Sequence, residues 1–125
     1  MRPLVVIDDE KAQLDLIHDI LTMNDYEIHC FQNLDQAFQA IKVLEPALVL
    51  CDYRMPEMDG VSFCRKIRQA GLIDNGYFII ITGLVELGEE DDDFHDLPDG
   101  WIPKKFSVDE FLEIINRWYQ MVPVL

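Results

Sequence analysis

Short runs of apolar, β-favouring residues alternate with segments of helical periodicity about five times along the chain. Leu4–Ile7, Ala47–Cys51 and Phe78–Ile81 are continuous apolar runs, which is typical of strands buried on both faces. Glu27–Phe31 alternates, as an edge strand would, and Trp101-Ile102 is a short fifth candidate. Because strands that alternate with helices form parallel sheets with right-handed crossovers, the pattern predicts an α/β fold with helices on both faces.

The segments between these runs carry apolar stripes with the spacing of amphipathic helices. The first covers roughly residues 11–23. Asn33 can cap a second helix, which Pro46 stops, and a third around Val61–Ile67 ends at Gly71. These positions predict three of the helices that connect the strands.

The last third of the chain contains one well-marked helix and one poor one. Ser107 and Glu110 form a capping box for the final helix. We interpret its apolar stripe as core rather than as an interface between copies: Phe111, Ile114, Ile115 and Trp118. Residues 84–96 are acidic and have little apolar stripe, so a helix there should be short, frayed or irregular.

The composition indicates one soluble domain that spans residues 1–125. Half of the residues are apolar and 27% are charged, with a net charge of −14, which argues against direct binding of nucleic acid or of an anionic membrane. No apolar run approaches the ~18 residues of a membrane span, and the start of the chain lacks a signal peptide. Cys30, Cys51 and Cys64 have neither disulfide nor zinc spacing. We therefore expect a cytoplasmic protein whose cysteines are small core residues.

Polar side chains follow four of the predicted strands. Asp8 and Asp9 follow the first, Asp52 the third, Thr82 the fourth and Lys104 the fifth. Each residue taken alone has an ordinary interpretation as a helix cap, a turn residue or a surface cation. Because the carboxyl ends of parallel strands meet at one edge of a sheet, we expect all of them to converge there.

Such a cluster of carboxylates favours a bound cation. Two carboxylates about 5 Å apart repel by roughly 3 kcal/mol at an effective dielectric constant of ~20. Mg²⁺ relieves this repulsion, because it prefers oxygen ligands and keeps waters that phosphoryl oxygens can replace. Lys104 would supply a second cation, Thr82 a hydroxyl donor and Asp52 a nucleophile that forms an acyl phosphate.

These motifs closely resemble the receiver domain of two-component response regulators, the CheY-like superfamily, from the first strand to the last helix. The family's acidic pair appears in Val5–Glu10, and its phosphoacceptor segment appears in Asp52–Gly60. Its switch threonine and the small residue after it match Thr82-Gly83, and its signalling lysine matches Lys104. The resemblance implies a flavodoxin-like (βα)₅ three-layer sandwich with a parallel five-stranded sheet of order 2-1-3-4-5.

The resemblance also implies a metal site and a phosphorylation reaction. Mg²⁺, or Mn²⁺ in its place, would be held by Asp9, Asp52 and the backbone carbonyl of Arg54, with Asp8 acting mostly through water. Asp52 would accept a phosphoryl group from the phosphohistidine of a histidine kinase or phosphotransfer protein, or from a small phosphodonor. The chain would then be a switch and not an enzyme, because its only chemistry is to gain and lose this group itself.

The implied output is a change of the surface that partners read. Thr82 would move to hydrogen-bond the phosphoryl group, and Trp101, three residues before Lys104, would swing inward; its alternative role is simple packing. The switch would control a downstream protein, a fused output domain or a homodimer.

Two features depart from the family pattern. The family usually has a proline after its lysine, joined by a cis bond, but Lys105 stands here. Either the loop is strained or it takes another path, in which case Lys105 replaces Lys104. Residues 86–99 hold eight acids and no Lys or Arg. They form either a solvated loop or an altered output face suited to a basic partner or an unusual dimer.

A third feature concerns the lifetime of the phosphoryl group. In this family the residues two beyond the acceptor and two beyond the switch threonine flank the attacking water, and here they are Arg54 and Leu84. Leu84 offers that water no hydrogen bond, so we expect slow loss of phosphate. Arg54 either contacts the phosphoryl group or is a solvent-exposed surface residue.

Two alternative functions remain at this point. An unphosphorylated pseudo-receiver would act as a scaffold, which Lys105 and the acidic segment favour but the complete residue set disfavours. A Mg²⁺-dependent phosphohydrolase would require an Asp-x-Asp after the first strand, whereas Asp8, Asp9 and Glu10 are adjacent.

Overall fold

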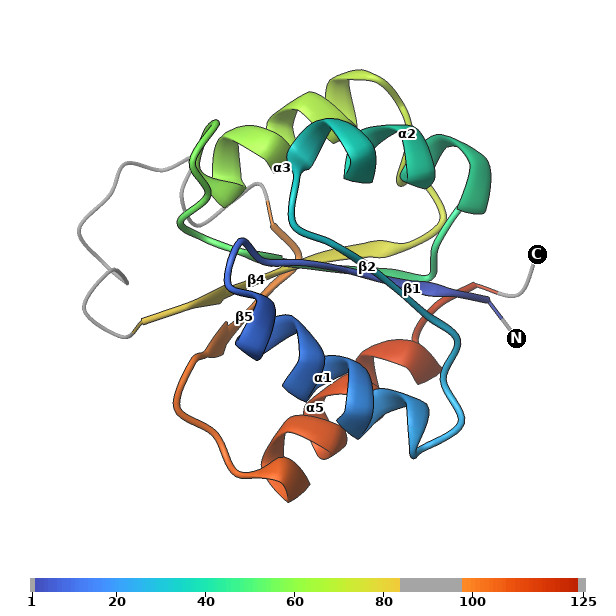
Figure 1. Cartoon of the computed structure of the whole chain (residues 1–125). Coiled ribbons are helices and arrows are strands. Elements are labelled where there is room, and N and C mark those ends of the chain that lie inside the picture. Colours follow the sequence, from blue (N-terminus) through green and yellow to red (C-terminus); the bar gives the residue numbers. More distant parts are fainter. Residues whose placement is uncertain (1, 84–97, 124–125) are drawn as a thin grey trace.

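The computed structural model describes residues 2–83 and 98–123 (Figure 1). The poor helix expected at residues 84–96, and with it Leu84, lies outside the described residues.

The centre of the molecule is a five-stranded sheet in which every neighbouring pair is parallel, with the order β2-β1-β3-β4-β5. This confirms the predicted α/β class and strand order. Strand β2 lies at an edge of the sheet, as its alternating sequence predicted, and it is half-buried along its whole length. The strands are β1 (Leu4–Ile7), β2 (Ile28–Phe31), β3 (Leu48–Asp52), β4 (Tyr77–Thr82) and β5 (Gly100–Pro103).

Helices cover both faces of the sheet and complete three layers. In Figure 1, α2 and α3 lie above the sheet, and α1 and α5 lie below it. The helices of the described residues are α1 (Lys11–Thr22), α2 (Leu34–Leu44), α3 (Gly60–Gln69) and α5 (Val108–Gln120). The three-layer sandwich predicted from the alternation of strands and helices is therefore confirmed.

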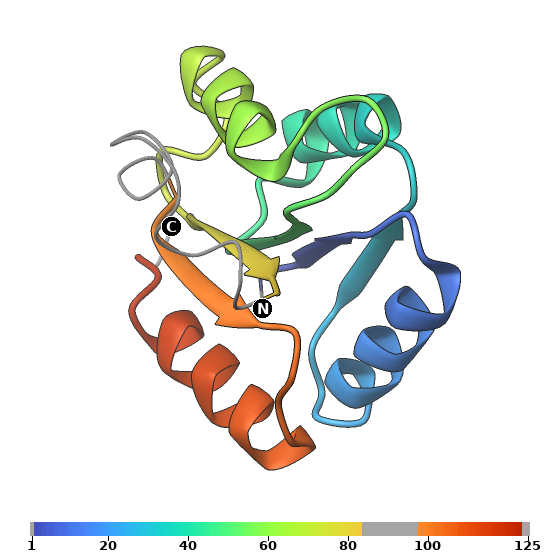
Figure 2. The ribbon, with the colours of Figure 1, turned by 90° about the vertical axis from the view of Figure 1, so that its left-hand side faces the viewer.

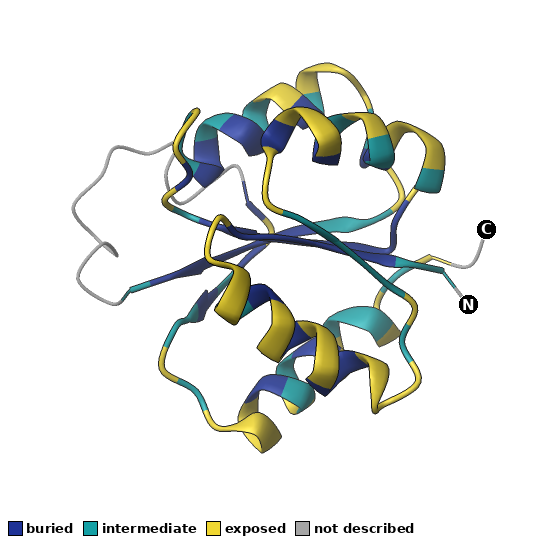
Figure 3. Ribbon diagram, in the orientation of Figure 1, coloured by how far each residue is buried: buried dark blue, intermediate teal, exposed yellow. Residues whose placement is uncertain are grey.

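The core consists of two apolar layers, one on each face of the sheet. Along β1, Leu4 and Val6 pack toward α1 and α5, whereas Val5 and Ile7 pack toward α2 and α3. Alternate strand residues face opposite sides, so both sets must be apolar when both faces are covered. Figure 3 shows the result, with buried strands between helices whose outer faces are exposed.

The helix ends follow the predicted caps, with one addition. The Asn33 side chain accepts a hydrogen bond from Gln36 N at 3.0 Å, and the capping box of Ser107 and Glu110 is present. The Asp59 side chain caps α3 by accepting from Ser62 N at 2.7 Å, a role that sequence reasoning missed.

The final apolar stripe packs in the core, as we expected. Phe111 and Ile115 are fully buried, and Ile114 and Trp118 pack against the α1/α5 side of the sheet. A Cβ added at Gly100 would lie 2.5 Å from Trp118 Cζ2. This close approach requires glycine at the start of β5.

The cysteines are also core residues, as predicted. Cys51 and Cys64 are buried, Cys30 is partly buried, and none of the three forms a disulfide within the described residues. Burial raises the pKa of Cys30 and of Cys64 to about 11, which keeps both thiols protonated at neutral pH.

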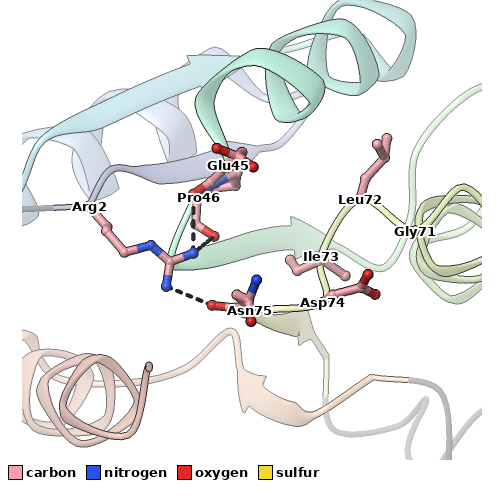
Figure 4. A pocket seen from close by; sticks show the side chains of 9 residues that line it. Arg2, Glu45, Pro46, Gly71, Leu72, Ile73, Asp74 and Asn75 are labelled. Atoms are coloured by element: carbon pink, nitrogen blue, oxygen red, sulfur yellow. Dashed lines mark hydrogen bonds between the residues drawn. The ribbon is translucent and has the colours of Figure 1, made fainter. Parts of the chain in front are cut away.

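The amino ends of the strands are held together by Arg2. Its guanidinium donates to the backbone oxygens of Asn75 at 2.6 Å and of Pro46 at 3.1 Å, beside a cavity of about 130 Å³ (Figure 4). It also donates to the backbone oxygens of Glu45 and Pro123, both at 3.2 Å. One side chain thus joins the segments before β1, β3 and β4 to the end of α5.

None of the helices in the described ranges is long and apolar enough to cross a lipid bilayer.

Candidate functional site

The predicted site residues come together at the carboxyl edge of the sheet, which faces the viewer in Figure 2. Asp8 directly follows β1, and Lys104 directly follows β5. Asp52 and Thr82 are themselves the last residues of β3 and β4, one residue further along each strand than the apolar runs predicted. The sheet ladder therefore fixes the backbone of Asp52 beside that of Ile81.

Three carboxylates form the centre of this edge. Asp8, Asp9 and Asp52 each offer an oxygen, and these atoms lie within 4.8 Å of one another. Asp8 is 1% exposed and Asp52 is 2% exposed, whereas Asp9 is exposed at the rim. The cluster is thus largely buried but open on the side of Asp9.

Lys104 reaches this cluster from β5. Its Nζ lies 3.0 Å from Asp52 Oδ1, and its backbone N donates to Thr82 O at 2.8 Å. The described residues contain no cis peptide bond, so the loop continues into Lys105 through a trans bond. Lys104 pairs with Asp52, whereas Lys105 is exposed, which favours Lys104 among the two lysines left open by the sequence.

The charges in the cluster shift the pKa values of its members. Burial raises the pKa of the Asp8 carboxyl to about 6, and the negative charge of Asp52 adds to the shift. A hydrogen bond from Glu10 N to Asp8 Oδ1, 2.9 Å long, opposes the rise. Partial burial lowers the pKa of Lys104, but the hydrogen bond and charge of Asp52 outweigh it and raise that pKa above its ordinary value.

The residues fit a hard divalent cation. Asp8 Oδ2 is buried and accepts no hydrogen bond within the described part of the chain. Burial of an uncompensated carboxylate oxygen is costly, and a cation removes that cost. Three carboxylates against one nearby ammonium leave a negative excess, and oxygen ligands are those that Mg²⁺ prefers. Asp8, Asp9 and Asp52 could therefore hold such an ion.

The remaining predicted site residues differ in how deeply they are buried. Thr82 is fully buried, and its hydroxyl donates to Gly83 O at 3.3 Å. Trp101 is partly buried and packs against the core layer beneath α2 and α3. Arg54 is exposed, two residues beyond Asp52.

The loop after Asp52 is held close to the strand ends by a glycine. Tyr53 N donates to Ile81 O at 2.9 Å, and Gly60 N donates to Tyr53 O at 2.7 Å. A Cβ on Gly60 would lie 2.8 Å from Asp52 O and from Ile80 Cδ1. Gly60, eight residues after Asp52, is therefore required by close packing on the backbone of Asp52.

One member of the acidic segment has a structural role that sequence reasoning missed. The Asp99 carboxylate accepts from Phe78 N and pairs with the Arg68 guanidinium, both at 2.8 Å. Asp99 thereby joins the start of β4 to α3, and the solvated-loop interpretation is wrong for this residue. Nothing in its sequence context distinguishes it from its acidic neighbours.

Comparisons with known proteins agree with this architecture. The response regulator MprA of Mycolicibacterium vanbaalenii is 28% identical over 109 residues, which are 87% of this chain and 46% of that protein. This chain thus spans about half the length of the curated relatives it matches.

Solved structures share the fold. A CheY-like receiver domain protein from Methanospirillum hungatei has a TM-score of 0.84 at 23% identity, covering 96% of this chain and 94% of the other. The response regulator TrrA from Thermotoga maritima, solved in complex with Mg²⁺ and BeF, has a TM-score of 0.81 at 24% identity, covering 94% and 99%. The model of the response regulator receiver domain matches residues 4–116, and the chain belongs to that family.

Proposed function

We propose that this receiver domain, over residues 1–125, is a phosphoacceptor switch in which Asp52 takes a phosphoryl group in a Mg²⁺-dependent reaction. The observation that carries the proposal is the meeting of Asp8, Asp9 and Asp52 with the ammonium of Lys104 at one edge of the sheet. A buried like-charge cluster costs stability, which is expected where binding of a cation and a phosphoryl group relieves it.

Each residue has a chemical role in this proposal. Asp9, Asp52 and the backbone carbonyl of Arg54 would hold the ion, with Asp8 acting mostly through water. When bound, Mg²⁺ would neutralise charge on the phosphoryl oxygens and orient them. An Asp52 carboxylate oxygen would attack phosphorus, the P–N bond of phosphohistidine would break, and the imidazole would keep the electron pair.

Lys104 and Thr82 would act on the phosphorylated state. The Lys104 ammonium, now paired with Asp52, would follow the charge onto the phosphoryl oxygens. The Thr82 hydroxyl, now bonded to Gly83 O, would turn to donate to one of them. The Trp101 ring would move with this change and alter the surface around β5.

The proposed donors are a histidine kinase, a phosphotransfer protein or a small phosphodonor such as acetyl phosphate. The proposed target that this domain controls is a downstream protein, a fused output domain or a second copy of this chain. Because MprA is about twice as long as this chain, its further parts carry no information about residues 1–125.

The experiment compares wild type with Asp52→Asn in acetyl phosphate and Mg²⁺, by intact mass and by release of inorganic phosphate. A switch gains one phosphoryl group on wild type and none on the variant. An unlabelled wild type would support the scaffold alternative, and release of many equivalents of phosphate would support a hydrolase. Label lost from wild type within seconds would contradict the slow release expected from Leu84.

A further inference from the structure

The junction between β2 and α2, residues 32–34, is hydrogen-bonded to two loops of the candidate site. Gln32 Nε2 donates to the backbone oxygen of Asp9 at 3.2 Å. The backbone N of Leu34 donates to Glu57 Oε2 at 3.0 Å. Asp9 belongs to the loop after β1, and Glu57 belongs to the loop after Asp52. The junction therefore links the two loops that carry the candidate metal ligands.

Glu57 acts on a helix end that already has a local cap. Asn33 binds Gln36 N within the same turn, and the exposed Glu57 carboxylate satisfies a second donor, Leu34 N, from 23 residues away in sequence. The first N–H groups of a helix lack intrahelical partners and favour a negative charge. The bond thus stabilises α2 and at the same time ties the acceptor loop to it.

Asp9 depends on its loop for its position. Its side chain is exposed at the rim, and no hydrogen bond within the described residues holds its carboxylate. The bond from Gln32 to its backbone oxygen therefore restrains the one carboxylate of the cluster that is not fixed by burial. Groups that orient metal ligands typically change metal affinity when they are removed.

We propose that Gln32 and Glu57 are positioning residues for the metal site, and that Mg²⁺ binding is coupled through them to the first turn of α2. The inference rests on the proposed function, since it assumes that the site binds Mg²⁺. The coupling is reciprocal: an ion that fixes the two loops also stabilises the junction between them.

Four variants distinguish the effect of the hydrogen bonds that position the loops from the effect of the negative charge near α2. Glu57→Ala removes the acceptor of the Leu34 bond, whereas Glu57→Gln removes the charge but keeps a side-chain oxygen that can accept it. Asp35→Ala removes the same charge from the first turn of α2 without touching either loop. Gln32→Ala removes the donor to Asp9. The Mg²⁺ dissociation constant of each is measured by isothermal titration calorimetry at constant ionic strength.

Glu57→Ala and Gln32→Ala should each raise the Mg²⁺ dissociation constant roughly 10-fold, as loss of ligand orientation does. Glu57→Gln and Asp35→Ala should stay within about twofold, because orientation rather than charge carries the effect. Hydrogen exchange of the Leu34 amide provides a second readout. Mg²⁺ should slow this exchange in wild type and in Glu57→Gln, and the slowing should be lost in Glu57→Ala.

A purely structural cap would give a different pattern. Glu57→Ala would then lower the unfolding temperature in EDTA, while its Mg²⁺ affinity and the Mg²⁺-dependent rise in that temperature stayed those of wild type. That result overturns the inference. So does an Asp35→Ala variant that binds Mg²⁺ as weakly as Glu57→Ala does. If Glu57→Ala does not fold, the Mg²⁺ dissociation constant of Gln32→Ala alone tests the inference, because the exposed Gln32 side chain does not cap α2.

The proposed function can fail separately. If wild type binds no Mg²⁺ and takes no label from acetyl phosphate, the proposed function and this inference are both wrong. If wild type is labelled on Asp52 and all four variants bind Mg²⁺ equally, only the positioning role of Gln32 and Glu57 is wrong.

Discussion

The two edges of the sheet use charge in opposite ways. At the amino edge, the Arg2 guanidinium donates to the carbonyl oxygens of Glu45, Pro46 and Asn75 (Figure 4). It also donates to the carbonyl oxygen of Pro123. At the carboxyl edge, three carboxylates crowd within 4.8 Å. The first arrangement pairs a cation with neutral acceptors, which stabilises the fold. The second concentrates like charges, which destabilises the fold unless a cation binds.

The comparison therefore separates residues that maintain the fold from residues that perform the proposed reaction. Substitutions at the amino edge should change stability and leave phosphorylation intact. Substitutions at the carboxyl edge should change phosphorylation strongly, and some of them should stabilise the protein.

The largest effect is expected for Lys104→Ala. Removing the ammonium 3.0 Å from Asp52 Oδ1 should slow labelling by acetyl phosphate about 10²- to 10³-fold, because a charge-stabilising donor next to the transferred group is lost. The measurement is the initial rate of labelling in saturating Mg²⁺. Lys105→Ala is the matched control and should label at nearly the wild-type rate. Equal rates for the two variants would show that Lys104 has no such role.

Asp8→Asn should make the metal-free protein more stable at neutral pH. Burial raises the Asp8 pKa from 3.8 to about 6, so the folded state binds this proton more tightly than the unfolded state. The stabilisation is present below about pH 4 and is lost as the pH rises through about 6. A pKa shift of this size corresponds to a loss of a few kcal/mol in the free energy of unfolding at pH 7.5. We expect the substitution to recover about 1–3 kcal/mol of this loss.

Urea unfolding in EDTA at pH 5 and pH 7.5 measures this effect. Wild type should lose stability between the two values, and Asp8→Asn should lose less. The variant should also gain less stability from Mg²⁺ than wild type does. A variant that is less stable than wild type at pH 7.5 without metal would contradict a destabilising Asp8 carboxylate.

Arg2→Ala tests the other edge. Loss of its hydrogen bonds to four carbonyl oxygens should lower the free energy of unfolding by about 1–3 kcal/mol. Labelling of Asp52 at a temperature where the variant is folded should match that of wild type. If labelling fell as strongly as in Lys104→Ala, the two edges would not be separable.

The smallest effect is expected for Lys11→Ala. Lys11 Nζ pairs with Asp15 across one turn of α1 at 3.2 Å, and both side chains are exposed. Such a pair contributes about 0.3–0.5 kcal/mol, reduced by salt. Urea unfolding at low and at high salt should detect little change in the free energy of unfolding. A loss of stability as large as that of Arg2→Ala would mean that charge alone, rather than burial, sets the difference between the edges.

Much of the fold follows directly from sequence patterns. Continuous apolar runs mark β1, β3 and β4 because both faces of these strands must be apolar, and the capping box of Ser107 and Glu110 marks the start of α5. The apolar runs end one residue before the strands do, at Asp52 and Thr82, because a polar residue ends an apolar run although its backbone still pairs in the ladder.

The contacts that span the sequence could not be predicted in the same way. The cap on α2 from Glu57, the Asp99 link to α3 and the four acceptors of Arg2 all join residues that only the folded chain brings together. Glu57, Asp99 and Arg2 are charged residues, and from the sequence alone such residues are expected to be exposed to solvent. The members of the carboxylate cluster could be predicted because each ends a strand or lies within two residues of a strand's end.

The most direct test of the central claim is ¹⁹F NMR of the protein with beryllofluoride, a phosphoryl mimic. We expect resonances from bound fluoride in wild type with Mg²⁺, which disappear when EDTA removes the ion and do not form in Asp52→Asn. Bound resonances that persist in Asp52→Asn, or their absence from wild type in saturating Mg²⁺, would contradict a metal-dependent phosphoacceptor site at Asp52.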